Sequence, residues 1–299
     1  MIFNETEKNL QDTRTQRLRR KNIRNLEGKI ALVTGAGRGV GAALAKRLAA
    51  AGASVVVNDL DEAPAEDTVQ EIVQNEGNAL SLCGSVTEKG FGETAVEFIL
   101  DNYGGLDIIV NNAGYIWNST ISKTSDEQWD AMISCHATAP FRILRAASNF
   151  IKTAALREES EGNSFHRKVV NVSSIAGFYG GATQIGYSAG KAAMIGITKT
   201  LAKEWARYRV NVNCVGFGLI DTRLTGVWDK RVPTSIEIGD RNHKVGFEKN
   251  TRKQLEEIIP LRRPGTVEEA AGALYLFCLP ESDYITGEII TAGGGLLSY

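Results

Sequence analysis

A tyrosine and a lysine at helical spacing form the first chemically suggestive pair in the sequence. Tyr187 and Lys191 lie four residues apart in the stretch YSAGK, so both side chains fall on one face of a helix. An ammonium group beside a phenol favours the phenolate, which predicts a Tyr187 pKa below its usual value of about 10. Such a phenol is a usable general acid or base near neutral pH. Ser174 precedes Tyr187 by 13 residues, and its hydroxyl is predicted to polarise a carbonyl beside that phenol.

A glycine-rich stretch, TGAGRGVG at residues 34–41, has the pattern of a phosphate-binding loop. It follows a short apolar run and opens an Ala/Leu-rich stretch with helical spacing, so the glycines sit where a strand turns into a helix. Glycines there allow the backbone to approach a pyrophosphate, and the N–H groups at the helix start attract the anion. Asp59 lies 24 residues after Gly35 at the end of the next apolar run, where a carboxylate can bind both ribose hydroxyls of a dinucleotide.

Two residues near this loop point to different dinucleotides. Asp59 favours NAD(H), because its carboxylate would repel a 2′-phosphate. Arg38 sits where a guanidinium could meet that phosphate, which keeps NADP(H) as the alternative. A buried repulsion costs more than one solvated contact gains, so the sequence favours NAD(H).

The elements that position these residues alternate along the chain. Apolar, β-branched runs are separated by stretches with helical periodicity, and most runs end in glycine or an acidic residue. Continuous apolar strands indicate a parallel sheet buried on both faces. We therefore predict an α/β fold, a Rossmann-type doubly wound parallel sheet of about seven strands with helices on both faces. The expected strands lie at residues 28–36, 54–60, 78–86, 106–114, 168–177, 209–218 and 285–295, and the expected helices at 40–52, 66–77, 91–104, 126–159, 187–208 and 267–279.

Three segments depart from the alternation. Residues 1–27 form an N-terminal arm with a charge of +3, expected to pack on a partner subunit, and residues 28–299 form the single catalytic domain. Residues 155–168 read as a polar insertion. Residues 223–263 are longer than a connection between a strand and a helix requires and carry a charge of +4, and residues 234–247 within them alternate around Gly239-Asp240 like a hairpin.

Composition excludes several classes of protein. The 299 residues carry a net charge of −1 and 43% hydrophobic residues, which excludes wholesale disorder and a general polyanion binder. The arm lacks aromatic residues between its basic ones, which argues against a nucleic-acid tail. The four cysteines are scattered without a CxxC pair, so neither a disulfide framework nor a metal site is expected. The absence of an apolar leader or of a long apolar span predicts a cytoplasmic protein without membrane association.

The combined motifs resemble the classical short-chain dehydrogenase/reductase family. The resemblance covers residues 28–295 and is carried by TGAGRGVG, NNAG at 111–114, Ser174, YSAGK at 187–191, and Gly218 with Thr222. The stretches IPLRRPGTVEEAAGALYLF and SDYITGEIITAGGG are most similar to 3-oxoacyl-[acyl-carrier-protein] reductases. The resemblance implies a catalytic set of Ser174, Tyr187, Lys191 and, in place of the family asparagine, His136. The cofactor-binding residues that the motifs and the resemblance indicate are Gly35, Arg38, Gly39, Val40, Gly41, Asp59, Ser85, Val86, Asn112, Ala113, Gly114, Tyr187, Lys191, Gly218, Ile220 and Thr222.

Departures from the family pattern fall on three positions. His136 stands where the family has an asparagine that holds a water in a proton relay to the lysine, and an imidazole can also bind water; the alternative is a satisfied buried histidine. Ser85 stands where the family usually has aspartate beside the adenine. Phe217 replaces the proline of the family's Pro-Gly pair, and either reshapes the nicotinamide side or simply packs.

The function implied is NAD(P)-dependent hydride transfer between a nicotinamide and a carbonyl or secondary alcohol. In the family, the segment at residues 223–263 covers the substrate, so the resemblance implies a substrate lid there and a substrate rim lengthened by both insertions; the alternative for this segment is a solvated surface loop. A 3-oxoacyl or 3-hydroxyacyl thioester is the first substrate hypothesis, because a basic lid would steer CoA or an acidic carrier protein. A dehydrogenase of a cyclic, steroid or aromatic alcohol is the alternative. A non-catalytic dinucleotide sensor would not need the catalytic set. The resemblance also implies a homotetramer.

Overall fold

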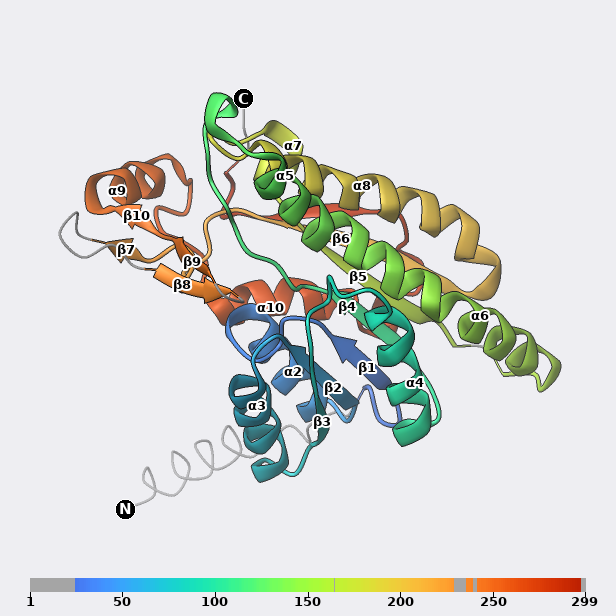
Figure 1. Ribbon diagram of the computed structural model, residues 1–299. Coiled ribbons are helices and arrows are strands. Elements are labelled where there is room, and N and C mark those ends of the chain that lie inside the picture. Colours follow the sequence, from blue (N-terminus) through green and yellow to red (C-terminus); the bar gives the residue numbers. More distant parts are fainter. Residues whose placement is uncertain (1–24, 164, 229–234, 239–240, 297–299) are drawn as a thin grey trace, which may run out of the picture.

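The computed structural model describes residues 25–163, 165–228, 235–238 and 241–296, and its centre is a seven-stranded parallel sheet (Figure 1). The strand order is β11-β6-β5-β4-β1-β2-β3, and every adjacent pair is parallel. This confirms the predicted Rossmann-type fold. The strands are β1 (Ile30–Val33), β2 (Ser54–Asp59), β3 (Asn78–Cys83), β4 (Ile108–Asn111), β5 (Arg167–Ser174), β6 (Val210–Phe217) and β11 (Ile289–Ala292).

Helices cover both faces of the sheet (Figure 1). One face carries α2 (Gly39–Ala50), α3 (Glu62–Gln74) and α10 (Val267–Leu276), and the other carries α4 (Phe91–Tyr103), α6 (Ala139–Ser160) and α8 (Ile185–Trp205). The central strands are buried along their whole length because side chains from both helical layers pack on them. The continuous apolar runs in the sequence follow from this double burial. Among the described residues, no helix combines the length and apolar character needed to span a membrane.

The order of the strands places the functional end of the sheet. The chain runs outward from β1 to β3 and then returns to β4 on the other side of β1. Loops that leave β1 and β4 therefore diverge to opposite faces, and a crevice opens at the carboxyl ends of these strands. The loop after β1 carries the predicted phosphate-binding glycines, and the loop after β4 carries Asn112–Gly114.

The hairpin predicted within residues 223–263 is present. Strands β8 (Ser235–Ile238) and β9 (Arg241–Lys244) pair antiparallel, and the residues 239–240 between them lie outside the described part of the chain. Two short strands, β7 (Val227–Trp228) and β10 (Phe247–Glu248), pair beside the hairpin and lead into α9 (Lys249–Ile258), which the sequence did not indicate. The remaining helices are α5 (Asp126–Ile133) and α7 (Ile175–Tyr179).

Residues 155–168 do not lie where the prediction placed them, at the substrate rim. Helix α6 continues through the polar stretch to Ser160, and β5 begins at Arg167. Glu158 and Arg167 are both buried and form a bidentate ion pair with N–O distances of 2.6 and 2.9 Å. The segment lies at the amino end of β5, away from the cleft, so it does not lengthen the substrate rim. Charged residues that satisfy one another inside the fold looked like a solvated loop in the sequence.

The N-terminal boundary also differs in detail. Leu26 is buried in the core, and its N–H donates a hydrogen bond to the carbonyl oxygen of Ala51 at 2.9 Å. The chain therefore joins the catalytic domain before residue 28. Residues 1–24 of the predicted arm lie outside the described residues.

Candidate active site

A cleft of about 1610 Å³ opens at the carboxyl ends of the strands. All of the site residues predicted from the sequence line this one cleft, although they come from eight separate stretches of chain. They are Gly35, Arg38, Gly39, Val40, Gly41, Asp59, Ser85, Val86, Asn112, Ala113, Gly114, His136, Ser174, Tyr187, Lys191, Gly218, Ile220 and Thr222. Parallel strands that end at one edge explain the convergence.

The glycine loop between β1 and α2 is held close to the loop after β4. Gly35 has a φ of +62°, and a Cβ at this position would lie 2.7 Å from the Cα of Ala113. Asn112 fastens the two loops, because its Nδ2 donates to the carbonyl oxygens of Thr34 at 2.9 Å and of Gly35 at 3.0 Å. The Thr34 hydroxyl accepts from the N–H groups of Asn112 and Ala113 at 3.1 Å. Asn112 therefore holds the phosphate loop in place through hydrogen bonds to its backbone, a role the sequence did not reveal.

Asp59 stands at the end of β2 beside the glycine loop. Its Oδ2 accepts a hydrogen bond from the Gly37 N–H at 2.9 Å, and its Oδ1 accepts from the Asp61 N–H at 3.2 Å. A Cβ on residue 37 would lie 2.8 Å from that Oδ2, so glycine is required there. The carboxylate is thus fixed at the edge of the cleft where the ribose hydroxyls of a dinucleotide would bind.

Arg38 is paired with an acid that sequence reasoning overlooked. Its Nη1 lies 2.6 Å from Oδ2 of Asp61, and both side chains are about half exposed. The guanidinium is therefore directed at a carboxylate of the protein. The signal in the sequence was the second aspartate of NDLD, two residues after Asp59.

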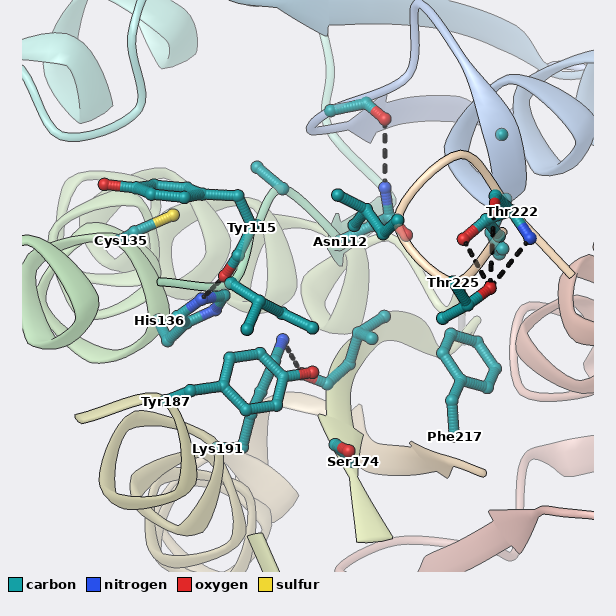
Figure 2. Close-up of a pocket in the computed structure, with 18 of the residues that line it drawn as sticks. Asn112, Tyr115, Cys135, His136, Ser174, Tyr187, Lys191, Phe217, Thr222 and Thr225 are labelled. Atoms are coloured by element: carbon teal, nitrogen blue, oxygen red, sulfur yellow. Dashed lines mark hydrogen bonds between the residues drawn. The ribbon is translucent and has the colours of Figure 1, made fainter. Parts of the chain in front are cut away.

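The three catalytic candidates converge on one part of the cleft, as Figure 2 shows. Ser174 ends β5 and caps α7, where its Oγ accepts from the Ala176 N–H at 3.2 Å. Tyr187 and Lys191 occupy successive turns at the start of α8, so one helix presents both side chains to the strand end. The Lys191 Nζ lies 5.8 Å from the centre of the Tyr187 ring.

The pKa of Tyr187 differs from the sequence prediction. Burial raises the pKa of this phenol above 10, and hydrogen bonding to Ser174 acts in the opposite direction. The Lys191 Nζ donates to the carbonyl oxygen of Val172 at 2.9 Å, so the ammonium is directed at the end of β5 as well as at the tyrosine. The phenol is therefore protonated at neutral pH and is suited to donating a proton.

Lys191 is itself perturbed by its surroundings. Burial lowers the pKa of its ammonium from 10.5 to about 8, partly offset by the thiols of Cys135 and Cys214. The group remains charged at pH 7 but titrates far closer to neutrality than a surface lysine. A buried cation at the end of β5 can hold polar groups of a bound molecule and support proton transfer.

His136 lies in a single π-helical turn, Ser134–Thr138, between α5 and α6. Its Nε2 lies 2.7 Å from the carbonyl oxygen of Tyr115, and its ring meets the Tyr187 ring edge-on with centroids 5.0 Å apart. Burial lowers the pKa of this imidazole well below 6.5, so it is neutral and Nε2–H is the donor. Its Nδ1 is buried without a hydrogen-bond partner among the described residues. A Cβ on Gly114 would lie 2.5 Å from the ring and a Cβ on Gly190 2.6 Å from its Cβ, so both glycines make room for His136.

The part of the cleft expected to receive the substrate is lined by the 223–263 segment and the loop after β4. Phe217, Phe247 and Leu255 contribute apolar surface, and Phe217 also packs against the core cluster beneath β6. Figure 2 places Phe217 on the opposite side of Tyr187 from His136. Arg223 lines the cleft, whereas the buried Arg252 pairs with Asp221 at 3.0 Å and with Glu256 at 2.8 Å.

Metal chemistry has no ligand set within the described residues. No group of three or more His, Cys, Asp or Glu side chains gathers there. The four thiols, Cys83, Cys135, Cys214 and Cys278, are free.

Comparison with known proteins identifies the family. The profile described as short chain dehydrogenase matches residues 29–232, and this span carries the glycine loop, Ser174, Tyr187 and Lys191. The chain belongs to this family. It is 34% identical over 276 residues to the 3-oxoacyl-[acyl-carrier-protein] reductase of Synechocystis sp., covering 92% of this chain and 99% of that protein. It is 32% identical over 272 residues to the reductase of the same name from Escherichia coli, covering 91% and 98%.

A solved structure supports the same assignment. A short-chain alcohol dehydrogenase from Sinorhizobium meliloti superposes with a TM-score of 0.78 at 29% identity, covering 91% of this chain and 98% of that one. As a short-chain dehydrogenase, the protein is an oxidoreductase acting on CH–OH or carbonyl groups with a nicotinamide dinucleotide. The cleft fits such a group, because the glycine loop leaves free N–H donors at the start of α2 and a fixed carboxylate beside them.

Proposed function

We propose that this short-chain dehydrogenase reduces 3-oxoacyl thioesters to 3-hydroxyacyl thioesters with NADH. The observation that carries the proposal is the convergence of Ser174, Tyr187 and Lys191 at the floor of one cleft, with a protonated phenol at its centre. Similarity over more than nine tenths of the chain to proteins named 3-oxoacyl-[acyl-carrier-protein] reductases supports the thioester substrate. A protonated phenol favours reduction, the direction that consumes a proton at the carbonyl oxygen.

The roles of the catalytic side chains follow from their positions. The nicotinamide, when bound, supplies the hydride to the carbonyl carbon. The Tyr187 hydroxyl donates its proton to the carbonyl oxygen, and the Ser174 hydroxyl donates a hydrogen bond to that oxygen as negative charge develops on it. Lys191, held by the Val172 carbonyl, places its ammonium where ribose hydroxyls would bind and stabilises the phenolate left after transfer.

His136 takes the place of the family asparagine in proton supply. The neutral imidazole has a buried lone pair on Nδ1 without a hydrogen-bond partner among the described residues. We infer that this lone pair accepts a hydrogen bond from a water that returns protons to Lys191 and Tyr187. Histidine and asparagine share this ability to accept, so the substitution retains activity.

NAD(H) is the proposed cofactor, with NADP(H) as the alternative. Support comes from the carboxylate of Asp59, fixed by the Gly37 N–H where a 2′-phosphate would have to sit. Pairing of Arg38 with Asp61 adds to this preference, because a guanidinium that already has a carboxylate partner gains less from a phosphate. The contact of Ser85 and Val86 with the adenine is part of the same proposal, since both line the cleft on this side.

CoA or a carrier protein is the proposed carrier of the acyl group. Several basic side chains of the lid are used internally: Arg252 pairs with Asp221, and Arg263 pairs with Glu269. Arg223 lines the cleft and is exposed, so it is the basic side chain best placed to meet an anionic carrier.

A homotetramer in the cytoplasm is the proposed working form. Exposed apolar side chains on α6 and beside the edge strand β11, Phe141, Leu156, Tyr284, Ile285 and Ile290, support self-association. An exposed free thiol at Cys83 suits a reducing compartment. Light scattering on the purified protein and on Tyr284→Ser tests the assembly, and fractionation of cells tests the compartment.

The experiment that tests the function combines titration and turnover. NADH and NADPH are titrated separately, and acetoacetyl-CoA is then added while absorbance at the nicotinamide band is followed. We expect rapid oxidation of NADH and slower oxidation of NADPH. Binding of NADH without oxidation would contradict the thioester proposal and would move the substrate to a cyclic or aromatic alcohol.

A further inference from the structure

The lid reaches back to the catalytic cleft through a buried histidine. His243 lies on β9 and is 5% exposed, whereas its neighbours Asn242 and Lys244 are exposed. Successive side chains of a strand point to opposite sides, so β9 turns one ring inward and two polar side chains outward. A two-stranded hairpin cannot bury a ring by itself, so the burial comes from contacts outside the hairpin.

Two rings on the segment between β4 and α5 provide those contacts. The His243 ring meets Trp117 with centroids 4.7 Å apart at 86°, and it meets Tyr115 at 5.2 Å and 61°. Both arrangements are edge-to-face, which is a preferred geometry for aromatic pairs. Tyr115 lines the cleft from the loop, and Glu237 lines it from β8, so the ring contact joins two walls of the substrate end.

Tyr115 continues the contact to the catalytic tyrosine. Its carbonyl oxygen accepts the hydrogen bond from His136 Nε2 at 2.7 Å, and the His136 ring meets the Tyr187 ring edge-on at 5.0 Å and 88°. Figure 2 shows Tyr115, His136 and Tyr187 in this order along one side of the cleft. A continuous set of contacts therefore runs from the lid through the loop to the proton donor.

A different set of contacts holds α9 and β10 to residues 221–228. Arg252 on α9 binds Asp221, Glu256 and the carbonyl oxygen of Thr225. The pairing of β10 with β7 adds backbone hydrogen bonds, and the Gly246 N–H donates to the Leu224 carbonyl oxygen at 3.0 Å. These contacts hold the later part of the lid to its beginning and do not include the His243 ring. The ring contact of His243 can therefore be lost without loss of the anchor.

We propose that His243 is a positioning residue that locks the lid onto the loop after β4 and, through Tyr115 and His136, sets the orientation of Tyr187. The position of the hairpin and the alignment of the proton donor are then coupled. The effect on turnover rests on the proposed function, whereas the ring lock itself does not.

Hydrogen exchange tests the lock without any assay of activity. The variants are His243→Ala, His243→Phe, which keeps a ring of similar shape, and Lys244→Ala as the control from the same strand. We expect the amides of β8, β9 and residues 115–117 to exchange about tenfold faster in His243→Ala, since two ring contacts are lost. Lys244→Ala should leave exchange unchanged, and His243→Phe should restore most of the protection.

Kinetics tests the connection to Tyr187. With acetoacetyl-CoA and NADH, His243→Ala should raise KM and lower kcat, each by about tenfold, with the Kd for NADH unchanged. A loose lid alone would raise KM and leave kcat as it is. His243→Phe should recover kcat, which separates the ring contact from any other role of the imidazole.

Trp117→Ala removes the partner ring of His243 and tests the lock even if His243→Ala fails to fold. It should accelerate exchange in β9, and the double variant should be no worse than the stronger single variant. Exchange rates that match Lys244→Ala in both single variants would overturn the lock. Faster exchange with unchanged kcat would retain the lock and overturn its connection to Tyr187. If no thioester turns over, the exchange data still decide the lock, so failure of the proposed function is recognised separately.

Discussion

The two ends of the cleft are built in different ways. At the cofactor end, loops leave the parallel strands β1, β2 and β4 and are tied by hydrogen bonds between backbone and side chain, such as that from the Gly37 N–H to the Asp59 carboxylate. At the substrate end, small two-stranded pieces, β7 with β10 and β8 with β9, lie outside the main sheet and depend on side-chain contacts.

This difference shows which part of the site is fixed by the fold. A phosphate loop must have glycines where backbone approaches backbone, and substitution there is opposed by steric clash, as at Gly35. The lid has such a requirement at Gly246, where φ is +91° and a Cβ would lie 2.4 Å from the Gly226 carbonyl oxygen, but ring packing and ion pairs also determine its position. We expect variants at the cofactor end to act on cofactor choice, and variants at the lid to act on KM for the substrate and, at His243, on kcat as well.

The largest effect should come from Tyr187→Phe. Removal of the proton donor should lower kcat by about 10²- to 10⁴-fold, because general acid catalysis contributes that much. The Kd for NADH should change little, since the ring and its contact with His136 remain. Steady-state kinetics with a fluorescence titration of NADH measures both. Tyr179→Phe, an exposed tyrosine, is the matched control and should behave as the wild type.

Asp59→Ala tests whether the cofactor end of the cleft selects NADH over NADPH. Removal of the carboxylate should raise the ratio of kcat/KM for NADPH over NADH by about 10- to 100-fold, as expected for loss of a charged hydrogen bond. Asp61→Ala in the same background should raise the ratio further by releasing Arg38, and adding Arg38→Ala should cancel that second gain. An unchanged ratio in Asp59→Ala would refute the assignment.

Burial of the Lys191 ammonium lowers the free energy of unfolding at neutral pH. Its pKa of about 8 in the folded protein lies below the unfolded value of 10.5, so folding disfavours the charged form. The resulting cost is fully present below pH 8 and disappears as pH rises from about 8 to 10.5. Lys191→Met should therefore be inactive yet more stable at pH 7 by about 1–3 kcal/mol, with the gain shrinking toward pH 10. Denaturant unfolding at several pH values measures this, and a gain independent of pH would contradict the buried cation.

The smallest effect should come from the lid surface. Arg223→Ala should raise KM for acetoacetyl-CoA no more than about fivefold, because an exposed charge pair contributes little in water. The rise should vanish in high salt. Lys253→Ala, an exposed lid residue away from the cleft lining, is the control and should not change KM.

The sequence predicted the sheet and the residues around the cleft because both depend on local patterns. Apolar runs buried on both faces marked the seven strands, and loops at their carboxyl ends brought Ser174, Tyr187 and the glycines together. The raised pKa of Tyr187 was not predictable from spacing, since it depends on burial and on where the Lys191 ammonium is directed.

Contacts between distant residues account for the remaining differences. Glu158 and Arg167 form a buried ion pair within the supposed polar insertion, and neither residue carries a local signal of burial. The pairing of Arg38 with Asp61 and the burial of His243 between Tyr115 and Trp117 arise in the same way. The hairpin itself was visible because its alternation around Gly239-Asp240 is local.

A single-turnover experiment tests the central claim most directly. The enzyme saturated with NADH is mixed with acetoacetyl-CoA in a stopped-flow instrument, and the decay of nicotinamide absorbance is compared between the wild type and Tyr187→Phe. We predict a rapid single-turnover decay in the wild type and a decay slowed by about 10²- to 10⁴-fold in the variant, with NADH bound equally well in both. Equal rates in the two proteins would contradict the assignment of Tyr187 as the proton donor.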